Sequence, residues 1–198
     1  MESINYALFL WLNAPEHPSA LALTLATFFA ERLIWAVPLL IGIEWLRGSE
    51  VLRKAMLVAT VSGLLSLLIS QAIGLAWFHP RPFMIGLGNT LISHVADASF
   101  PSDHLTLWWA VAFSLSLQQG PRILGLALAL LGIPIAWARI YLGVHFPFDM
   151  FGAATVAGLS AWMTLRSIRW YLAPSYRIAT SIHQRLFGKL IMLGWVHE

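Results

Sequence analysis

The chain of 198 residues is 59% hydrophobic and only 11% charged, and its mean hydropathy is +0.73. Soluble domains carry about 25% charged residues, so one globular core could not bury this many apolar side chains. The composition predicts a membrane protein and excludes an ordinary soluble domain. The formal net charge of +3 does not indicate a nucleic-acid partner, because membrane proteins gather basic residues on cytoplasmic loops. The absence of cysteine excludes disulfides and thiolate metal sites.

In chain order, one short apolar segment is followed by five longer ones. Residues 4–12 are too few to cross a bilayer and predict an interfacial or partly re-entrant helix. Crossing takes about 20 apolar residues, and the candidate spans are residues 19–43, 55–76, 104–119, 122–142 and 149–170. The tail from residue 173 mixes basic and apolar side chains and predicts an amphipathic helix on the membrane surface. We therefore expect an all-α, polytopic membrane helix bundle, with residues 1–198 forming a single domain.

The basic residues predict the orientation of these segments. In a five-span arrangement, every Lys and Arg except Arg32, Arg81 and Arg139 falls on the same side of the membrane. That side is expected to be cytoplasmic, because cytoplasmic loops are enriched in basic residues. The C-terminus then lies in the cytoplasm, whereas the loop 77–103 and the turn 143–148 face the periplasm or exterior.

The first polar motif is His79-Pro80-Arg81-Pro82, directly after the second predicted span. The prolines stop the helix and leave Arg81 on a stiff, extended backbone near the outer interface. A guanidinium there can donate two hydrogen bonds to phosphate oxygens. The alternative is an interfacial arginine that contacts lipid headgroups, with His79 as a polar end-cap.

The second motif, Pro101-Ser102-Asp103-His104, precedes the third predicted span. Ser102 is the expected N-cap of that helix, and helix N-termini bind anions. In the first turn, His104 could donate a proton to a departing oxygen, and Asp103 could orient a histidine or an arginine. Simple capping by Ser102 and Asp103 is the alternative, but it leaves His104 without a function.

The third motif comprises Arg139, His145 and Asp149, between the fourth and fifth predicted spans. A charge at the end of a span is costly unless it has a partner or a function. Asp149 follows His145 by four residues, so its carboxylate can bond one ring nitrogen and leave the other as a base or nucleophile. The alternative is a structural ion pair between Arg139 and Asp149. Because all three motifs are expected on one membrane face, we predict a single phosphate site.

These motifs resemble those of the phosphatidic acid phosphatase type 2 superfamily, which also includes vanadium haloperoxidases and bacterial acid phosphatases. Arg81-Pro82, residues 101–104 and Arg139-x5-His145-x3-Asp149 match the superfamily pattern in order and spacing. Residues 79–83 and 96–104 are similar to the bacitracin-resistance branch, the undecaprenyl-diphosphate phosphatases.

The resemblance implies a reaction and a role for each site residue. His145 is expected to attack phosphorus with help from Asp149, and His104 to protonate the leaving group. Arg81, Arg139 and Ser102 are expected to bind the phosphate. The implied reaction converts undecaprenyl diphosphate to undecaprenyl phosphate and phosphate in the bacterial inner membrane, which returns the carrier lipid to cell-wall synthesis. The implied partners are this polyprenyl lipid and membrane lipids, and the resemblance implies no metal or other cofactor.

The chain departs from the superfamily pattern at three positions. Gly74 stands where the motif lysine would fall, Ala138 replaces a serine, and Asp103 replaces a glycine. The missing cation suggests a role in phosphate binding for Arg32 or its neighbour Glu31, both at mid-span in the first predicted helix. The alternative for these two residues is a buried ion pair that fixes helix packing.

Other functions remain open at this point. The same residues would serve a phosphatase for phosphatidylglycerol phosphate or phosphatidic acid, or a transferase that passes phosphate between lipids. A non-catalytic transporter is a further alternative, although transporters often show paired repeats with broken helices, and no repeat is visible in this sequence.

Overall fold

The computed structural model describes residues 2–196, and every regular element in this range is helical. The α-helices are α1 (Glu2–Leu12), α2 (Ala20–Thr27), α3 (Ala36–Arg47), α4 (Glu50–Ala76), α5 (Asp103–Ser116), α6 (Arg122–Tyr141), α7 (Pro147–Arg166) and α8 (Ile168–Met192). A π-helical turn (Phe28–Arg32) and a 3₁₀ turn (Leu33–Trp35) join α2 to α3, and a further 3₁₀ turn (Pro82–Ile85) follows α4. The predicted all-α fold is confirmed.

Three of the predicted spans are long and apolar enough to cross a membrane. They are Ala20–Arg47, Glu50–Ala76 and Arg122–Tyr141, which correspond to the first, second and fourth predicted spans. α5 has 14 residues and ends at Ser116, earlier than expected, because Gly120 and Pro121 lie just beyond it and disfavour helix. The chain is a membrane protein with three candidate spans in its described part.

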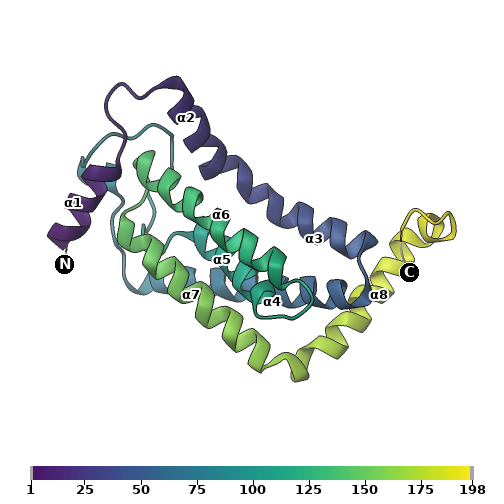
Figure 1. The fold of residues 1–198 in the computed structure, drawn as a ribbon. Coiled ribbons are helices and arrows are strands. Elements are labelled where there is room, and N and C mark those ends of the chain that lie inside the picture. Colours follow the sequence, from purple (N-terminus) through teal and green to yellow (C-terminus); the bar gives the residue numbers. More distant parts are fainter. Residues whose placement is uncertain (1, 197–198) are drawn as a thin grey trace.

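The short helix α5 lies in the middle of the bundle, where it packs against α4, α6 and α7 (Figure 1). Its indole N–H groups reach α6: Trp108 donates to Leu128 O at 2.7 Å and Trp109 to Ala129 O at 3.0 Å. Gly132 permits this approach, because a side chain there would overlap the Trp109 ring. Neighbouring helices therefore surround α5, and its N-terminus is held at a defined place among them.

The connections between helices gather at two ends of the bundle (Figure 1). At one end lie α1, the loop from α4 to α5 and the turn from α6 to α7. The other end holds the α3–α4, α5–α6 and α7–α8 connections. The loop and the turn that carry the three polar motifs therefore share one end, as the sequence predicted.

The N-terminal helix α1 covers the turn between α6 and α7. Tyr6 and Phe9 each place their ring centroid 5.3 Å from that of Phe146. Asn5 Oδ1 accepts a hydrogen bond of 3.1 Å from the Phe148 backbone N–H. The short helix predicted at residues 4–12 is present, and its inner face supports the start of α7.

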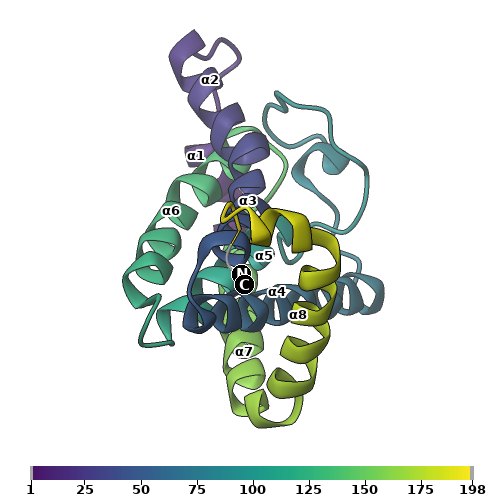
Figure 2. The same ribbon diagram turned by 90° about the vertical axis from the view of Figure 1, so that its right-hand side faces the viewer.

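The C-terminal helix α8 starts at Ile168, earlier than the expected residue 173. It turns back from the end of α7 and crosses α4 (Figure 2). Trp45 at the end of α3 contacts the rings of Tyr176 and His183, with centroid distances of 6.1 and 6.2 Å. The tail is therefore helical, as predicted, and one of its faces packs on the bundle.

The expected buried ion pair between Glu31 and Arg32 is wrong. Both side chains are exposed, and the described residues contain no ion pair between them. In the π-helical turn the small residue Ala30 faces the bundle instead, buried with its carbonyl oxygen 3.5 Å from Arg139 Nη1. Successive helical residues point in different directions, so the two charged neighbours of Ala30 turn away from the core.

Candidate active site

The structure brings the key residues of the three motifs together at one end of the bundle. The cluster is built from the loop after α4, the end of α6, the turn that follows it and the start of α7. Arg81, Arg139, His145 and Asp149 are each at most 3% exposed. Four ionisable side chains buried at one place require partners, and their hydrogen bonds define what the site can do.

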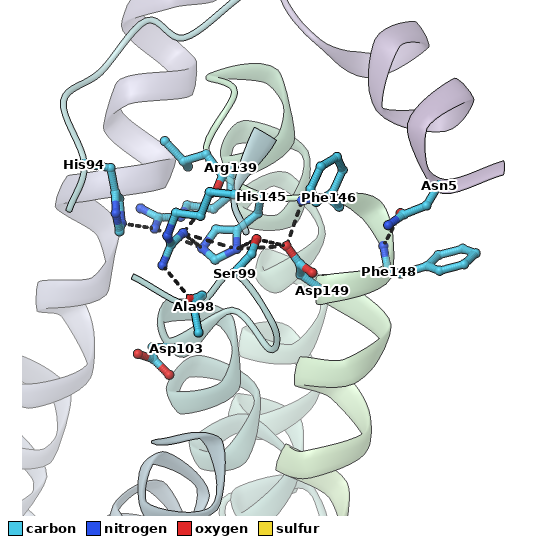
Figure 3. A network of polar contacts seen from close by, with 12 residues as sticks. Asn5, His94, Ala98, Ser99, Asp103, Arg139, His145, Phe146, Phe148 and Asp149 are labelled. Atoms are coloured by element: carbon cyan, nitrogen blue, oxygen red, sulfur yellow. Dashed lines mark hydrogen bonds and ion pairs between the residues drawn. The ribbon is translucent and has the colours of Figure 1, made fainter. Parts of the chain in front are cut away.

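The hydrogen bonds of His145 fix its tautomer (Figure 3). Its Nδ1 lies 3.1 Å from Asp149 Oδ2. Its Nε2 lies 2.9 Å from Arg81 Nη1 and 3.3 Å from Arg139 Nη2. An arginine can only donate, so Nε2 must accept and the ring proton must be on Nδ1. The Nε2 lone pair therefore points toward two guanidinium groups.

Asp149 is held by three donors. Besides the His145 ring, the Phe146 backbone N–H donates to its Oδ2 at 2.8 Å, and the Ser99 hydroxyl donates to the same oxygen at 2.5 Å. Ser99 is fully buried. Sequence reasoning missed Ser99, although it stands only two residues before Pro101, where the second motif starts. These bonds keep the carboxylate in place behind the histidine.

The surroundings of His145 favour the neutral ring. Complete burial is the main cause, and the positive charges of Arg139 and Arg81 add to it, so the pKa of His145 is lowered well below the usual histidine value. The ring is therefore uncharged at neutral pH. Its Nε2 stays unprotonated and accepts hydrogen bonds from Arg81 and Arg139. An uncharged imidazole with a fixed tautomer can act as a nucleophile.

Arg81 is fixed by partners on several sides. It donates to the backbone carbonyls of Val144 at 3.0 Å and Ala98 at 3.2 Å. Its Nε donates to Asp97 Oδ1 at 2.7 Å, and the Asp97 side chain is 53% exposed. The alternative of a free interfacial arginine at this position is therefore wrong.

Arg139 reaches the same place from the last turn of α6. Its Nη2 donates to His94 Nε2 at 2.9 Å. The described residues contain no Arg139–Asp149 ion pair, because the Asp149 carboxylate is turned toward His145. His94 belongs to the loop that precedes α5 and was not predicted. It stands in no motif, and the only signal in the sequence was its place in the outward loop.

Ser102 occupies the N-cap position of α5, but its side chain does not cap the helix. Ser19 and Ser49, which do cap α2 and α4, have ψ angles of 144° and 163°. The ψ angle of Ser102 is 111°, so its backbone differs from that of the two capping serines. The hydroxyl is buried without a hydrogen-bond partner within the described residues.

His104 and Asp103, in the first turn of α5, have different surroundings. His104 makes no hydrogen bond within residues 2–196 and lies within electrostatic range of Arg139, His94 and Arg81. Asp103 instead faces α4, where its carboxylate accepts from Ser70 Oγ at 2.5 Å and Gln71 Nε2 at 2.7 Å. Figure 3 shows Asp103 apart from the histidine cluster. The expectation that Asp103 orients a site histidine or arginine is therefore wrong.

A cavity of about 250 Å³ adjoins the cluster through Asp97 and Ala98, both bonded to Arg81. The cluster residues Arg81, Arg139, His145 and Asp149 are not part of its lining. Gly74 lines it, at the position of the missing motif lysine, together with Asp97 and Asp103. Arg32 does not line this cavity and is not hydrogen-bonded to the cluster. Among the described residues, no group of three His, Asp or Glu side chains is arranged to hold a metal ion.

Comparison with known proteins identifies the family. The sequence profile of the PAP2 superfamily matches residues 55–172. The chain belongs to the PAP2 superfamily. The match begins in α4 and ends in α8, so it includes the whole hydrogen-bonded cluster and the fixed histidine. The protein is thus a PAP2-type membrane phosphatase.

Two curated relatives are similar over nearly the full length. The protein named "Putative undecaprenyl-diphosphatase YbjG" of Escherichia coli (strain K12) is 35% identical over 100% of both chains. Undecaprenyl-diphosphatase BcrC of Bacillus subtilis (strain 168) is 33% identical over 94% of this chain and 95% of its own. The sequence resemblance to this branch is confirmed.

Two solved structures share the fold. LpxE of Aquifex aeolicus has a TM-score of 0.64 at 24% identity, covering 82% of this chain and 95% of its own. A transmembrane PAP2-type phosphatidylglycerolphosphate phosphatase from Bacillus subtilis has a TM-score of 0.56 at 17% identity, covering 86% and 87%. At these identities the similarity is evidence for the fold alone.

Proposed function

We propose that this chain hydrolyses undecaprenyl diphosphate to undecaprenyl phosphate and inorganic phosphate at the outer face of the bacterial inner membrane. The observation that carries the proposal is the geometry of His145, whose unprotonated Nε2 faces Arg81 and Arg139 while its Nδ1–H donates to Asp149. The names of the two full-length relatives support the choice of lipid.

In the first step, the Nε2 lone pair of His145 attacks the terminal phosphorus. The bond from phosphorus to the bridging oxygen breaks, and His104 gives its proton to the departing undecaprenyl phosphate. The Nδ1–H bond to Asp149 stabilises the positive charge that develops on the ring. Arg81 and Arg139 already lie beside Nε2. As the lone pair turns from their N–H groups to phosphorus, these groups can move their hydrogen bonds to the equatorial oxygens.

In the second step, water hydrolyses the phosphohistidine. His104, now unprotonated, accepts a proton from the attacking water, and the phosphorus–nitrogen bond breaks to release phosphate. Within the described residues His104 has no hydrogen-bonded partner, so it can gain and lose a proton without breaking a hydrogen bond there. The unpaired hydroxyl of Ser102 is a further donor for a phosphate oxygen.

The surface around the cavity suits a substrate that arrives from the bilayer. Leu75 and Phe78, which line the cavity, are 89% and 57% exposed, and the neighbouring Trp77 is 54% exposed. Aromatic side chains are enriched at membrane interfaces. In this proposal α5 and α7 cross the membrane beside the three candidate spans, and the polar head enters while the prenyl chain stays in lipid.

The direct test uses purified protein with undecaprenyl diphosphate labelled with ³²P in the terminal phosphate. We expect His145→Ala to lower phosphate release by about 10⁴-fold or more. Acid-labile, alkali-stable label should appear on the wild-type protein after rapid quenching. His17→Ala is the matched control, because His17 is exposed and distant in sequence from all three motifs. Undiminished turnover by His145→Ala would refute the proposed nucleophile.

A panel of lipids tests the substrate. Phosphatidylglycerol phosphate and phosphatidic acid are presented at the same concentration as undecaprenyl diphosphate. We expect the polyprenyl diphosphate to give the highest kcat/KM. A higher value for either phospholipid would replace the proposed substrate while leaving the mechanism intact.

The proposed orientation can be tested with single cysteines, because the chain has none. Ser93→Cys lies in the loop beside the site, and Gln119→Cys lies in the α5–α6 connection at the opposite end; both positions are exposed. A membrane-impermeant maleimide should label only the first in intact cells. Labelling of Gln119→Cys alone would show that the topology is the reverse of the one proposed.

A further inference from the structure

His94 is a partly buried histidine at the edge of the site. The proposed reaction gives it no role. Its Nε2 lies 2.9 Å from Arg139 Nη2, and its ring centroid is 6.2 Å from that of His145 (Figure 3). The same Arg139 nitrogen lies 3.3 Å from the nucleophilic Nε2 of His145. A phosphoryl group bound at that nitrogen would therefore share a donor with His94.

In the structure His94 is a neutral acceptor. Arg139 can only donate, so His94 Nε2 carries no proton, and Nδ1–H donates to the Val95 carbonyl oxygen at 3.1 Å. A proton on Nε2 would point at a guanidinium N–H, which is unfavourable while the site has no anion. The free protein therefore holds His94 in the state that cannot donate to phosphate from Nε2.

An arriving phosphate reverses this preference. A diphosphate head brings more negative charge than Arg81 and Arg139 carry together, and Asp97 already neutralises part of the charge on Arg81. Once a phosphate oxygen lies between Arg139 and His94, a proton on His94 Nε2 has an acceptor and an opposite charge beside it.

We propose that His94 takes up one proton from solution when the phosphate head binds, and that its imidazolium donates from Nε2 to an oxygen of that head. This inference rests on the proposed function and identifies the third cation of the same site. His94 then makes direct contact with substrate, and it contributes to binding rather than to bond cleavage.

The groups around His94 set the direction of its protonation. Arg139 comes from α6, Arg81 and Asp97 from the same loop, His145 from the α6–α7 turn and His104 from α5. In the free protein, burial is the main cause that lowers the pKa of His94, and Arg81 and Arg139 lower it further, whereas the bond to Val95 and the charge of Asp97 oppose this. Bound phosphate adds negative charge and raises the pKa, so binding is expected to be tighter as the pH falls toward 6.

The test is calorimetric titration of the full-length protein with inorganic phosphate, in two buffers of different ionisation enthalpy at the same pH. Inorganic phosphate can change its own protonation on binding in both proteins, so the difference between them is the result. The wild type should take up more protons than His94→Asn as phosphate binds. With the lipid substrate, His94→Asn should raise KM about tenfold with a smaller change in kcat, because a charge-assisted hydrogen bond is lost. The slope of KM against pH should also flatten.

Control variants separate this role from a structural one. His17→Asn, at an exposed histidine on the same side of the proposed topology, should behave as the wild type. His94→Gln places an uncharged amide N–H near the position of the histidine Nε2, whereas the shorter Asn side chain reaches only as far as Nδ1. His94→Gln should therefore recover part of the affinity but none of the additional proton uptake. Thermal unfolding in detergent reports whether each variant is folded.

Three outcomes would overturn the inference. The first is equal proton uptake by wild type and His94→Asn, and the second is a collapse of kcat with unchanged KM, which would make His94 part of the chemical step. The third is normal phosphate affinity in the variant. The first and third outcomes come from phosphate binding without turnover, so they are independent of whether the wild type cleaves undecaprenyl diphosphate.

Discussion

The two histidines assigned to the proposed reaction sit in opposite environments. His145 is fully buried and bonded on both ring nitrogens, in the turn between α6 and α7. His104, in the first turn of the neighbouring helix α5, has no hydrogen bond in the described chain. A nucleophile needs one tautomer and one direction, whereas a proton donor must change its protonation state twice per turnover. The fixed surroundings of His145 suit a nucleophile, and the lack of hydrogen bonds at His104 within the described chain suits a proton donor.

The largest effect should follow from a change in which ring nitrogen of His145 carries the proton. Asp149→Asn keeps the shape of the side chain but can place an amide N–H opposite Nδ1, which moves the ring proton to Nε2 and occupies the attacking lone pair. We expect kcat to fall by about 10³- to 10⁴-fold with little change in phosphate binding. Steady-state kinetics and phosphate titration measure the two quantities. A comparable loss of phosphate affinity would instead assign Asp149 to substrate binding.

The proton donor can be tested separately with the leaving group. His104→Asn should slow turnover of the lipid diphosphate by about 10²- to 10³-fold, because general acid catalysis is lost. With p-nitrophenyl phosphate, whose leaving group needs no proton, the first step should stay fast while hydrolysis of the phosphohistidine remains slow. Stopped-flow absorbance should then show a burst of p-nitrophenol equal to the enzyme concentration. An equal defect without a burst would remove His104 from the acid role.

Helix positions and the local part of the site were predictable from sequence. Hydropathy placed the helices, and the spacing of four residues between His145 and Asp149 predicted their contact. Contacts made by the loop before α5 were not predictable in the same way. Ser99 reaches Asp149 across 50 residues, and His94 reaches Arg139 across 45. No helical period relates such positions, because the path of the loop decides which of its side chains face inward.

One expectation was met in part and another was wrong. Ser102 occupies the N-cap position that its residue type predicts, but its hydroxyl bonds no N–H of the helix, and the residue type does not give the direction of the side chain. Asp103 lies beside His104 in the chain but faces α4, because adjacent helical residues point about 100° apart. Motif membership therefore predicted the neighbourhood of these side chains but not their direction.

The fixed environment of His145 also depends on Ser99, with a smaller expected effect. Ser99→Ala removes one of three donors to Asp149, while the Phe146 N–H and the His145 ring remain. We expect kcat/KM to fall about tenfold, since one hydrogen bond to a charged group is lost. Ser93→Ala, at an exposed serine of the same loop, is the control. If Ser99→Ala has wild-type kinetics, the other two donors alone are sufficient to orient the carboxylate.

The smallest effect is expected at Arg32, which the sequence had suggested as the missing cation. Its guanidinium is exposed, whereas its neighbour Ala30 is buried with its carbonyl oxygen near Arg139 Nη1. Arg32→Ala should leave the specific activity within about twofold of wild type, because an exposed charge far from contact is strongly screened. Activity per milligram of folded protein is the measurement, with His94→Asn assayed in parallel. A large loss of specific activity at normal yield for Arg32→Ala, with none for His94→Asn, would identify Arg32 rather than His94 as the third cation of the site.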